Sequence, residues 1–408
     1  MRKEIANYIE LIIRIGINIQ KGQILVVSAP VETFEFTRKV VEIAYKFGAK
    51  EVVINWTDEV CGKYRYIYGA EEIFDIYPKY QADMMKDYAE KGAAFLSIYA
   101  TDPEILKDVD QERVARAQKA RSIALKGYYE KAMNNEVQWC VVSIPTDAWS
   151  KKIYPDLQGE EAKERLWNQI LSIVRADSEN PVEEWNKHLT NLKNTMNYLN
   201  SMKFRKLRYR NSLGTDLEIG LPKGHIWTAG GETSKDGVYF VANMPTEEVF
   251  TLPKKDEVNG IVYSSKPFCY GGNLIENFYL KFENGRVVEA GAEKGEETLI
   301  KLLDSDDGAR YLGEVALVPY DSPISNSNTV FYNTLFDENA SCHLALGQAY
   351  PVCLEGGSEM NEDELKKNGV NISMVHEDFM VGTSDLEIVG ITEDGEEILI
   401  MKDGNFCK

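Results

Sequence analysis

The sequence predicts two domains: an α/β N-terminal domain with a parallel sheet, and an α+β, β-rich C-terminal domain. Three observations predict this. In the first half, short apolar runs alternate with amphipathic stretches of helical spacing, which is typical of strand–helix–strand units. Beyond residue 200 the apolar spacing changes to a period of two around turn signals. A length of 408 residues suits two domains. We therefore expect domains over residues 1–200 and 201–408.

The first half contains four apolar runs of strand length. The first run precedes an amphipathic stretch over residues 32–48, which predicts a helix closed by Gly48. Residues 160–201 are charged and predict two helices, the second of which begins at Pro181. No G-x-G-x-x-G motif follows a predicted strand, so a dinucleotide cofactor is not indicated. The four expected strands are residues 23–28, 51–56, 93–99 and 137–144.

The second half shows hairpin signals. Residues 203–222 alternate with a period of two around Asn-Ser-Leu-Gly at 211–214. Further turns are indicated by Glu-Asn-Gly at 283–285 and Glu-Asp-Gly at 393–395. We expect antiparallel strands on both sides of each turn, and hence a β-rich domain.

The charge balance restricts the partners. The formal net charge is -19, from 46 Lys and Arg against 65 Asp and Glu. Such a chain repels phosphate backbones, so we expect no nucleic-acid partner. Glu10 and Arg14 interrupt the apolar N-terminal stretch, which argues against a signal peptide. No apolar run approaches the roughly 20 residues of a membrane span. We expect a cytoplasmic protein with no membrane partner.

The six cysteines predict neither a disulfide framework nor a structural zinc site. They are spread along the chain, and none forms a C-x-x-C pair. We expect buried, reduced thiols that behave as small apolar side chains. These residues are Cys61, Cys140, Cys269, Cys342, Cys353 and Cys407.

Two of the four histidines stand near acidic residues, and the first is in His376-Glu377-Asp378. It follows a strand-like run over residues 370–375. Residues two apart on a strand project to the same face, so His376 and Asp378 should converge. Imidazole and carboxylate are a common pair of ligands for a divalent metal. The alternative is a hydrogen-bonded structural pair. The H-E-x-x-H zinc motif does not fit, because its fifth position is Met380.

The second is His343, five residues after Glu338. We expect Asn339 or Ser341 to cap a helix that continues from His343 to Tyr350. Glu338 would stay in the preceding loop, and His343 and Tyr350, seven residues apart, would share one helix face. A carboxylate, an imidazole and a phenol would then face one cavity. Alternatively, the acids only balance the helix dipole.

Three further acids stand out by their apolar surroundings. Glu314 heads an almost wholly apolar run over residues 312–319, and a carboxylate at the mouth of a buried strand needs a partner. Glu247 and Glu248 are followed directly by two large apolar residues. Adjacent acids are usually surface charges, and this alternative stays open for the pair.

Four segments together resemble the aminopeptidase T / PepS family of metallo-aminopeptidases: residues 243–251, 310–319, 333–351 and 376–382. Their order and long spacings fit this family as well. The resemblance implies two divalent ions held by side chains of the second half, and it implies that Tyr350 lines the reaction centre. The ligands that it implies are Glu248, Glu314, Glu338, His343, His376 and Asp378.

The charges of this ligand set are consistent with two ions. Four carboxylates brought together repel one another and raise their pKa values, whereas two divalent cations cancel four negative charges. Two ions about 3.5–4 Å apart can share and activate one water near neutral pH. Oxygen ligands with two imidazoles suit zinc, cobalt, manganese or magnesium.

We expect an aminopeptidase that hydrolyses the N-terminal peptide bond of short peptides through a metal-bridging hydroxide. One ion would hold the free α-amine, and the Tyr350 hydroxyl would help to stabilise the oxyanion. Glu247 is the candidate that passes the proton to the leaving amine. If its segment is a strand, its side chain points away from that of Glu248. The family is typically dimeric, so we also expect a homodimer.

Two other functions remain open on the sequence. A two-metal hydrolase of another amide or ester would use the same ligands with a different pocket. A metal-dependent binding protein would use the acidic groups but would have no need for a phenol such as Tyr350 beside the ions. The simplest alternative is a two-domain α/β protein in which all these acids are surface charges. The position of Glu314 ahead of an apolar strand argues against it.

Overall fold

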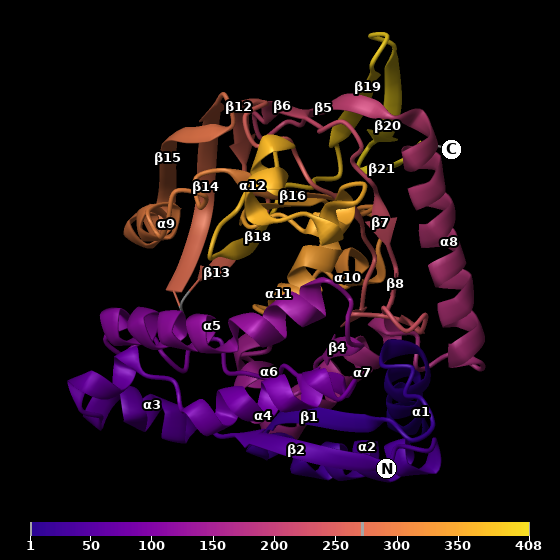
Figure 1. Cartoon of the computed structure of the whole chain (residues 1–408), viewed down its shortest axis with the longest axis vertical. Helices are drawn as coiled ribbons and strands as arrows, with labels where there is room; N and C mark the ends of the chain where they lie inside the picture. Colours follow the sequence, from indigo (N-terminus) through magenta and orange to yellow (C-terminus); the bar gives the residue numbers. More distant parts are fainter. Residues whose placement is uncertain (1, 271–272, 408) are drawn as a thin grey trace. The chain divides into compact units, whose positions relative to one another are not determined.

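The computed structural model describes residues 2–270 and 273–407. Figure 1 shows the chain coloured along the sequence, with helices and parallel strands in its indigo and purple part and mostly strands in its orange and yellow part. The predicted fold class, an α/β part with a parallel sheet followed by a β-rich part, is confirmed.

The chain divides into two compact units. Unit 1 comprises residues 1–188 and 231–245, and unit 2 comprises residues 189–230 and 246–408. A short segment of the second half therefore belongs to the unit formed by the first half. The predicted domain boundary itself stays a prediction.

Unit 1 is built on a five-stranded parallel sheet in the order β10-β4-β3-β1-β2. Four of these strands are the four predicted apolar runs. Leu25, Val26 and Val27 are consecutive and all buried, so both faces of the sheet are covered, as is usual for parallel sheets. The strands are β1 (Ile24–Pro30), β2 (Glu51–Thr57), β3 (Ala94–Ile98), β4 (Trp139–Val142) and β10 (Asn243–Met244).

Helices cover the two faces of this sheet. Helices α4 and α5 pack on Val26 and Phe95. Helices α1, α2 and α7 meet through Tyr8, Phe36 and Trp167, whose neighbouring rings lie 6.1 and 6.0 Å apart. The strand order reverses between β2 and β3, which places the crossover helices α2 and α4 on opposite faces. The helices are α1 (Lys3–Leu11), α2 (Phe34–Lys46), α3 (Glu59–Tyr68), α4 (Lys79–Glu90), α5 (Gln111–Met133), α6 (Asp147–Ile153), α7 (Gly159–Ile173) and α8 (Pro181–Met202).

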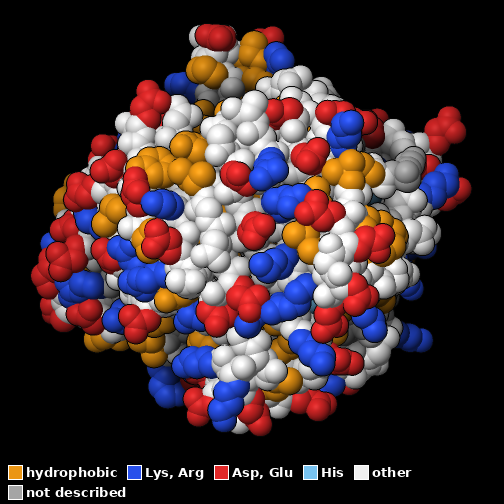
Figure 2. Space-filling model, turned by 90° about the horizontal axis from the view of Figure 1, so that it is seen from above, with side chains coloured by type: hydrophobic (Ala, Val, Ile, Leu, Met, Phe, Trp, Pro, Cys, Tyr) orange, Lys and Arg blue, Asp and Glu red, His pale blue; other side chains and the backbone are white. Residues whose placement is uncertain are grey.

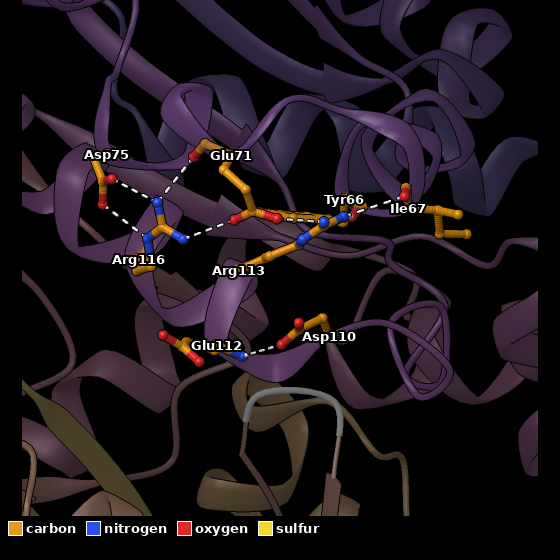
Figure 3. A network of polar contacts seen from close by, with 8 residues as sticks. All are labelled: Tyr66, Ile67, Glu71, Asp75, Asp110, Glu112, Arg113 and Arg116. Atoms are coloured by element: carbon orange, nitrogen blue, oxygen red, sulfur yellow. Dashed lines mark hydrogen bonds and ion pairs between the residues drawn. The ribbon is translucent and has the colours of Figure 1, made fainter.

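Helix α5 is fixed at its N-terminal half by charged contacts. Asp110 caps the helix, and Arg116 forms two hydrogen bonds of 2.6 and 2.9 Å with Asp75 (Figure 3). Arg113 pairs with Glu71, from the same short 3₁₀ segment as Asp75. Water screens exposed ion pairs of this kind, so they mainly orient this segment against the helix. Two short strands, β8 (Glu232–Thr233) and β9 (Tyr239–Phe240), complete unit 1.

Unit 2 contains a nine-stranded antiparallel sheet in the order β13-β14-β12-β6-β5-β19-β20-β21, with β15 paired to β14. The three predicted turns all join paired strands. At one of them, Asn284 and Gly285 both have positive φ, 49° and 83°, as a two-residue hairpin requires. The strands are β5 (Phe204–Arg210), β6 (Asp216–Gly220), β12 (Val258–Tyr263), β13 (Phe268–Tyr270), β14 (Asn273–Glu283), β15 (Arg286–Lys294), β19 (Glu387–Thr392), β20 (Glu397–Lys402) and β21 (Asn405–Phe406).

A second sheet of unit 2 has five strands in the order β18-β17-β16-β11-β7. Its buried residues Val315, Leu344 and Phe379 share one hydrophobic core with Leu207 and Ile219 of the nine-stranded sheet. One face of the five-stranded sheet therefore packs against this hydrophobic core. The strands are β7 (Thr228–Ala229), β11 (Val249–Thr251), β16 (Leu312–Leu317), β17 (His343–Gly347) and β18 (His376–Met380), and the helices of unit 2 are α9 (Glu296–Leu303), α10 (Pro323–Asn326), α11 (Thr334–Asp337) and α12 (Glu362–Lys367).

Ion pairs join strands of the nine-stranded sheet. Arg210 of β5 lies 3.1 Å from Asp216 of the neighbouring β6, and Arg208 of β5 reaches across β19 to within 2.7 Å of Glu397 on β20. Figure 2 shows lysines and arginines interspersed with acidic side chains on the visible face rather than gathered into one basic patch.

Among the helices of the described residues, none combines the length and the apolar character that crossing a bilayer requires.

The cysteine prediction is partly wrong. Cys140, Cys342 and Cys353 are free and buried, as expected, but Cys61 and Cys407 are free and exposed. Cys61 lies on α3, which has no buried residue, so this helix offers no core position for a thiol. The side chain of Cys269 lies outside the described residues.

Candidate metal centre

The helix predicted from His343 to Tyr350 is wrong. Residues His343–Gly347 form strand β17, which pairs with β16 on one side and with β18 on the other. Leu344 and Leu346 alternate into the core, which is the period of a strand. Pairing on both sides outweighs the helix propensity of leucine and alanine, because propensity is a weak preference beside tertiary contacts.

The end of β17 depends on a glycine. Gly347 has a φ of +102°, and a Cβ at this position would lie 2.0 Å from the backbone oxygen of Val375. Only glycine allows this close approach without strain. Tyr350 follows three residues later and directly precedes the short 3₁₀ segment Pro351–Cys353, rather than ending a helix.

The strand register brings four predicted ligands to one face of the five-stranded sheet. Asp378 lies opposite Ala345, and Ala345 lies opposite Glu314. Directly opposed residues of antiparallel strands share a face. His376 is two residues from Asp378, and His343 is two residues from Ala345, so both imidazoles project to this same face.

Glu248 joins this face from the next strand. It precedes β11, in which Phe250 lies opposite Ala316, and Ala316 is two residues from Glu314. Glu248 is in turn two residues from Phe250, so an extended chain directs it to the same side.

Distances confirm that five of these side chains meet. Nε2 of His343 lies 3.1 Å from Oε2 of Glu248 and 3.5 Å from Oε1 of Glu314. Nε2 of His376 lies 3.7 Å from Oε2 of Glu314 and 3.5 Å from Oδ1 of Asp378. Glu314 therefore presents one oxygen to each imidazole.

The other nitrogen of each imidazole is held by the backbone. Nδ1 of His376 lies 2.7 Å from the carbonyl oxygen of Gln348, and Nδ1 of His343 lies 3.3 Å from that of Ser341. A carbonyl oxygen only accepts, so both Nδ1 atoms carry the proton. In the neutral imidazoles the lone pair of Nε2 then faces the acids, the arrangement in which a histidine binds a metal.

Glu338 approaches from outside the sheet. It begins the 3₁₀ segment Glu338–Ala340 and is buried. Asn339, which is fully buried, donates to Oε1 of Glu338 at 3.3 Å and accepts a 2.8 Å hydrogen bond from the backbone nitrogen of Glu247. Asn339 thus connects two acidic segments, a role that the sequence, which suggested only a helix cap, did not reveal. The carboxylate of Glu247 belongs to neither of the possible metal-ligand groups in the described residues.

Burial and charge crowding perturb the acids. Burial raises the pKa of Glu314 to about 7, and hydrogen bonding to His343 only partly opposes this. Burial, reinforced by Asp378 and Glu248, holds the pKa of Glu338 well above its usual value. Burial acts to raise the pKa of Asp378, but attraction and hydrogen bonding to His376, together with attraction to His343, outweigh it and lower this pKa.

The neighbouring acids raise the pKa values of both imidazoles. Burial alone would lower the pKa of His376, but Asp378 and Glu314 raise it to about 10. Burial likewise opposes charge on His343, yet hydrogen bonds to Glu248 and Glu314 raise its pKa well above the usual value. The site therefore strongly attracts positive charge.

Tyr350 lies beside this group. Its ring meets the ring of His376 edge to face at 4.9 Å and that of Phe250 at 5.9 Å. Burial and the nearby carboxylates, Glu314 first among them, raise the pKa of Tyr350 well above its ordinary value. The phenol therefore keeps its proton at neutral pH and can donate a hydrogen bond.

The donor set fits divalent cations. Glu248, Glu314 and His343 offer ligand atoms that lie within 4.8 Å of one another, and so do Glu314, His376 and Asp378. Carboxylate oxygens with imidazole nitrogens suit zinc and similar ions. Cations would also neutralise acids that otherwise raise one another's pKa values. The six predicted ligands gather as expected, although their role as ligands stays a prediction.

The fold and this site define a metal-dependent hydrolase of the metalloprotease class. The chain belongs to the M29 family of thermophilic metalloproteases, whose model matches residues 1–406. The resemblance to metallo-aminopeptidases, inferred from four segments of the sequence, is thereby confirmed.

Several relatives match nearly the whole chain. Aminopeptidase 2 of Geobacillus stearothermophilus is 48% identical over 99% of this chain and 98% of its own length. Aminopeptidase AmpS of Bacillus subtilis is 46% identical over the same shares. The solved structure of wild-type AmpT from Thermus thermophilus has a TM-score of 0.93 at 39% identity and covers 99% of both chains.

Proposed function

We propose that this chain is a two-metal aminopeptidase that removes the N-terminal residue of short peptides. One observation carries the two-metal part: Glu314 directs its two carboxylate oxygens to two different imidazoles, 3.5 and 3.7 Å away. A carboxylate in this position can bridge two ions. The names of the relatives, all aminopeptidases, support the choice of substrate.

The two groups of ligand atoms suggest how the ions are shared. Glu248, Glu314 and His343 would hold one ion, and Glu314, His376 and Asp378 would hold the other. The carboxylates of Asp378 and Glu248, one from each group, both raise the pKa of Glu338, so Glu338 is near enough to be proposed as the sixth ligand. When bound, two divalent ions supply Lewis acidity and activate water for hydrolysis; zinc, cobalt, manganese and magnesium all suit these ligands.

The remaining chemistry falls to the chain's own groups. The protonated Tyr350 hydroxyl donates to the oxyanion that develops from the scissile carbonyl. Glu247 is the proposed carrier of the proton to the leaving amine, and its backbone is fixed by the hydrogen bond to Asn339. The unprotonated α-amine of a free N-terminus would bind one of the ions through its nitrogen lone pair, which an N-acetylated peptide could not do.

Chelation and blocked substrates test this function together. Exhaustive chelation should abolish hydrolysis of aminoacyl p-nitroanilides, and added Co²⁺ or Zn²⁺ should restore it at two ions per chain. N-acetylated peptides should not be cleaved. Activity that survives chelation would reject the metal mechanism, and equal cleavage of blocked peptides would favour a hydrolase of another amide or ester.

The assembly of the chain is proposed from the family resemblance, and its location and partners from its acidic charge and its interrupted apolar N-terminal stretch. We infer a homodimer in the cytoplasm, acting on peptides rather than on nucleic acids or membranes. Light scattering coupled to size-exclusion chromatography measures the oligomeric state, and a mass of 46.3 kDa, that of a single chain, would contradict the dimer.

A further inference from the structure

The residue that follows Glu338 carries a fully buried amide. Asn339 is 0% exposed and lies in the 3₁₀ segment that Glu338 begins. An amide in such a place needs hydrogen-bond partners, because burying it without them is unfavourable. It caps no following helix, since the chain continues into strand β17. Its partners therefore indicate what the amide does.

Both ends of the Asn339 side chain are bonded. Oδ1 accepts a hydrogen bond of 2.8 Å from the backbone nitrogen of Glu247. Nδ2 donates to the carbonyl oxygen of Leu335 at 3.1 Å and to Oε1 of Glu338 at 3.3 Å. A backbone nitrogen only donates, so the amide oxygen must face Glu247 and the amide nitrogen must face Glu338. The bond to Glu247 thus keeps a donor directed at the Glu338 carboxylate.

The carboxylate of Glu338 lies among other acids. The carboxylates of Asp378, Glu248 and Glu314 all repel it. Repulsion alone would turn the Glu338 side chain away from these acids, and hydrogen bonds to charged oxygens are stronger than those between neutral groups. The donor of Asn339 therefore opposes the repulsion by holding Oε1, and it leaves Oε2 available to a cation.

The backbone around Asn339 is held as well. The hydroxyl of Ser322, which is 1% exposed, donates to the carbonyl oxygen of Ala340 at 3.3 Å. The amide itself reaches a residue 92 positions earlier in the chain, directly before Glu248. The donor that faces Glu338 is thus fixed by contacts on both sides, as a group that orients a ligand must be.

We propose that Asn339 is a positioning residue of the metal centre, whose amide directs the carboxylate of Glu338 to the ions. The inference rests on the proposed two-metal function. Groups that orient the ligands of a metal contribute to its affinity without touching it, and losing one typically weakens binding about 10–100-fold. Asn339 acts through Glu338 and contacts neither substrate nor ion.

Asn339→Leu tests this role, because leucine has a similar branched shape but no charge and no hydrogen-bonding group. The full chain is stripped by chelation and titrated with Mn²⁺ in a calorimeter. We expect the affinity of the variant for Mn²⁺ to fall by roughly 10–100-fold, with circular dichroism unchanged. If Asn339→Leu does not fold, Asn339→Ala, which adds no bulk, takes its place with the same expected loss.

Asn200 provides the matched control. Its amide also donates one hydrogen bond and accepts another, each of 2.9 Å, but both partners are backbone atoms of Trp227. Asn200→Leu should lower the free energy of unfolding, as urea denaturation measures, and leave the affinity for Mn²⁺ unchanged. A loss of stability would then not account for weaker ion binding in Asn339→Leu.

A double-mutant cycle separates an action through Glu338 from a general structural effect. In a Glu338→Gln chain, the fold-loss in Mn²⁺ affinity caused by Asn339→Leu should be smaller by a factor of about three or more, as for residues in contact. Unchanged affinity in Asn339→Leu, or an equal fold-loss in both backgrounds, overturns the positioning role.

Hydrolysis of leucyl p-nitroanilide judges the proposed function separately. A wild-type chain that binds Mn²⁺ but does not cleave this or any other aminoacyl substrate refutes the aminopeptidase. The Mn²⁺ titrations then still decide the role of Asn339, because they require no substrate.

Discussion

Glu314 stands between the two histidines, with one carboxylate oxygen 3.5 Å from His343 and the other 3.7 Å from His376. Glu314→Gln keeps the shape of the side chain but removes its negative charge and one acceptor oxygen. We expect the variant to retain its fold, bind fewer than two ions per chain and lose activity. Elemental analysis, circular dichroism and a p-nitroanilide assay measure the three properties.

Glu387→Gln is the matched control for this change. Glu387 is an exposed glutamate on β19 of the same unit. Its variant should keep both ions and full activity. A Glu314→Gln protein that remains active and holds two ions would contradict the assignment of Glu314.

Tyr350 contributes in a different way, because its phenol lies against His376 but belongs to neither ligand group. Tyr350→Phe removes only the hydroxyl. We expect kcat to fall by about 10²-fold, as for loss of one oxyanion donor, with metal content unchanged. Steady-state kinetics and elemental analysis on the same preparation check this. An unchanged kcat would remove Tyr350 from the catalytic groups.

The raised pKa values predict how metal binding depends on pH. Without ions, the pKa of Glu314 is about 7 and that of His376 about 10, so both hold protons at pH 6. Metal ligation requires their unprotonated forms, so binding must release protons, and affinity should rise from pH 6 to pH 8. Calorimetric titrations with Mn²⁺ in two buffers of different ionisation enthalpy measure both effects. An affinity that is flat or falls with pH would contradict this charge arrangement.

Single residues were the most readable part of the sequence. A histidine and an aspartate two apart after an apolar run, and a glutamate at the start of another, could be singled out from residue type and spacing, and the family resemblance then implied their role as ligands. Asn339 and Gln348 could not be recognised in this way. Asn339 acts through its amide and Gln348 through a backbone carbonyl, and these contacts depend on partners that the fold brings close.

At the scale of elements, the start of β18 is held by Asp306. Its carboxylate accepts hydrogen bonds from the backbone nitrogens of Gly308, at 2.7 Å, and Met374, at 2.6 Å, and from the hydroxyl of Ser373, at 2.9 Å. Asp306→Ala removes these contacts two residues before His376. We expect a loss of about 3 kcal/mol in the free energy of unfolding, and weaker metal binding because the imidazole loses its position.

The neighbouring acid provides the control for Asp306. Asp307 is exposed, and Asp307→Ala should change the free energy of unfolding by less than about 0.5 kcal/mol. Urea unfolding and metal titration of both variants measure the difference. Equal metal affinity in Asp306→Ala and the wild type would show that β18 keeps its position without this support.

The elements could be predicted where their periodicity was unambiguous. The four strands of the first half, α7 and α8 and the hairpin turns are found as expected. The stretch from His343 to Tyr350 was misread because leucine and alanine favour helices, and both strand neighbours of β17 are distant in sequence. The predicted ligands still converge. The register of β16, β17 and β18 places their side chains on one sheet face, where the sequence predicted one face of a helix.

At the scale of the whole molecule, the sequence did not predict that a short segment of the second half joins unit 1. Residues 231–245 belong to unit 1, where Asn243 and Met244 of β10 pair in parallel with Val141 and Val142 of β4. Two residues of strand are too short for a detectable period, and their partners lie about a hundred positions earlier. Length and composition predict two domains but not this return of the chain.

We propose that six side chains from five segments hold two ions around Glu314. Anomalous difference maps from crystals of the Co²⁺-loaded protein test it most directly. We predict two peaks, one beside Glu248 and His343 and one beside His376 and Asp378, with Glu314 in contact with both. A single peak, or peaks away from these side chains, would contradict the two-metal centre.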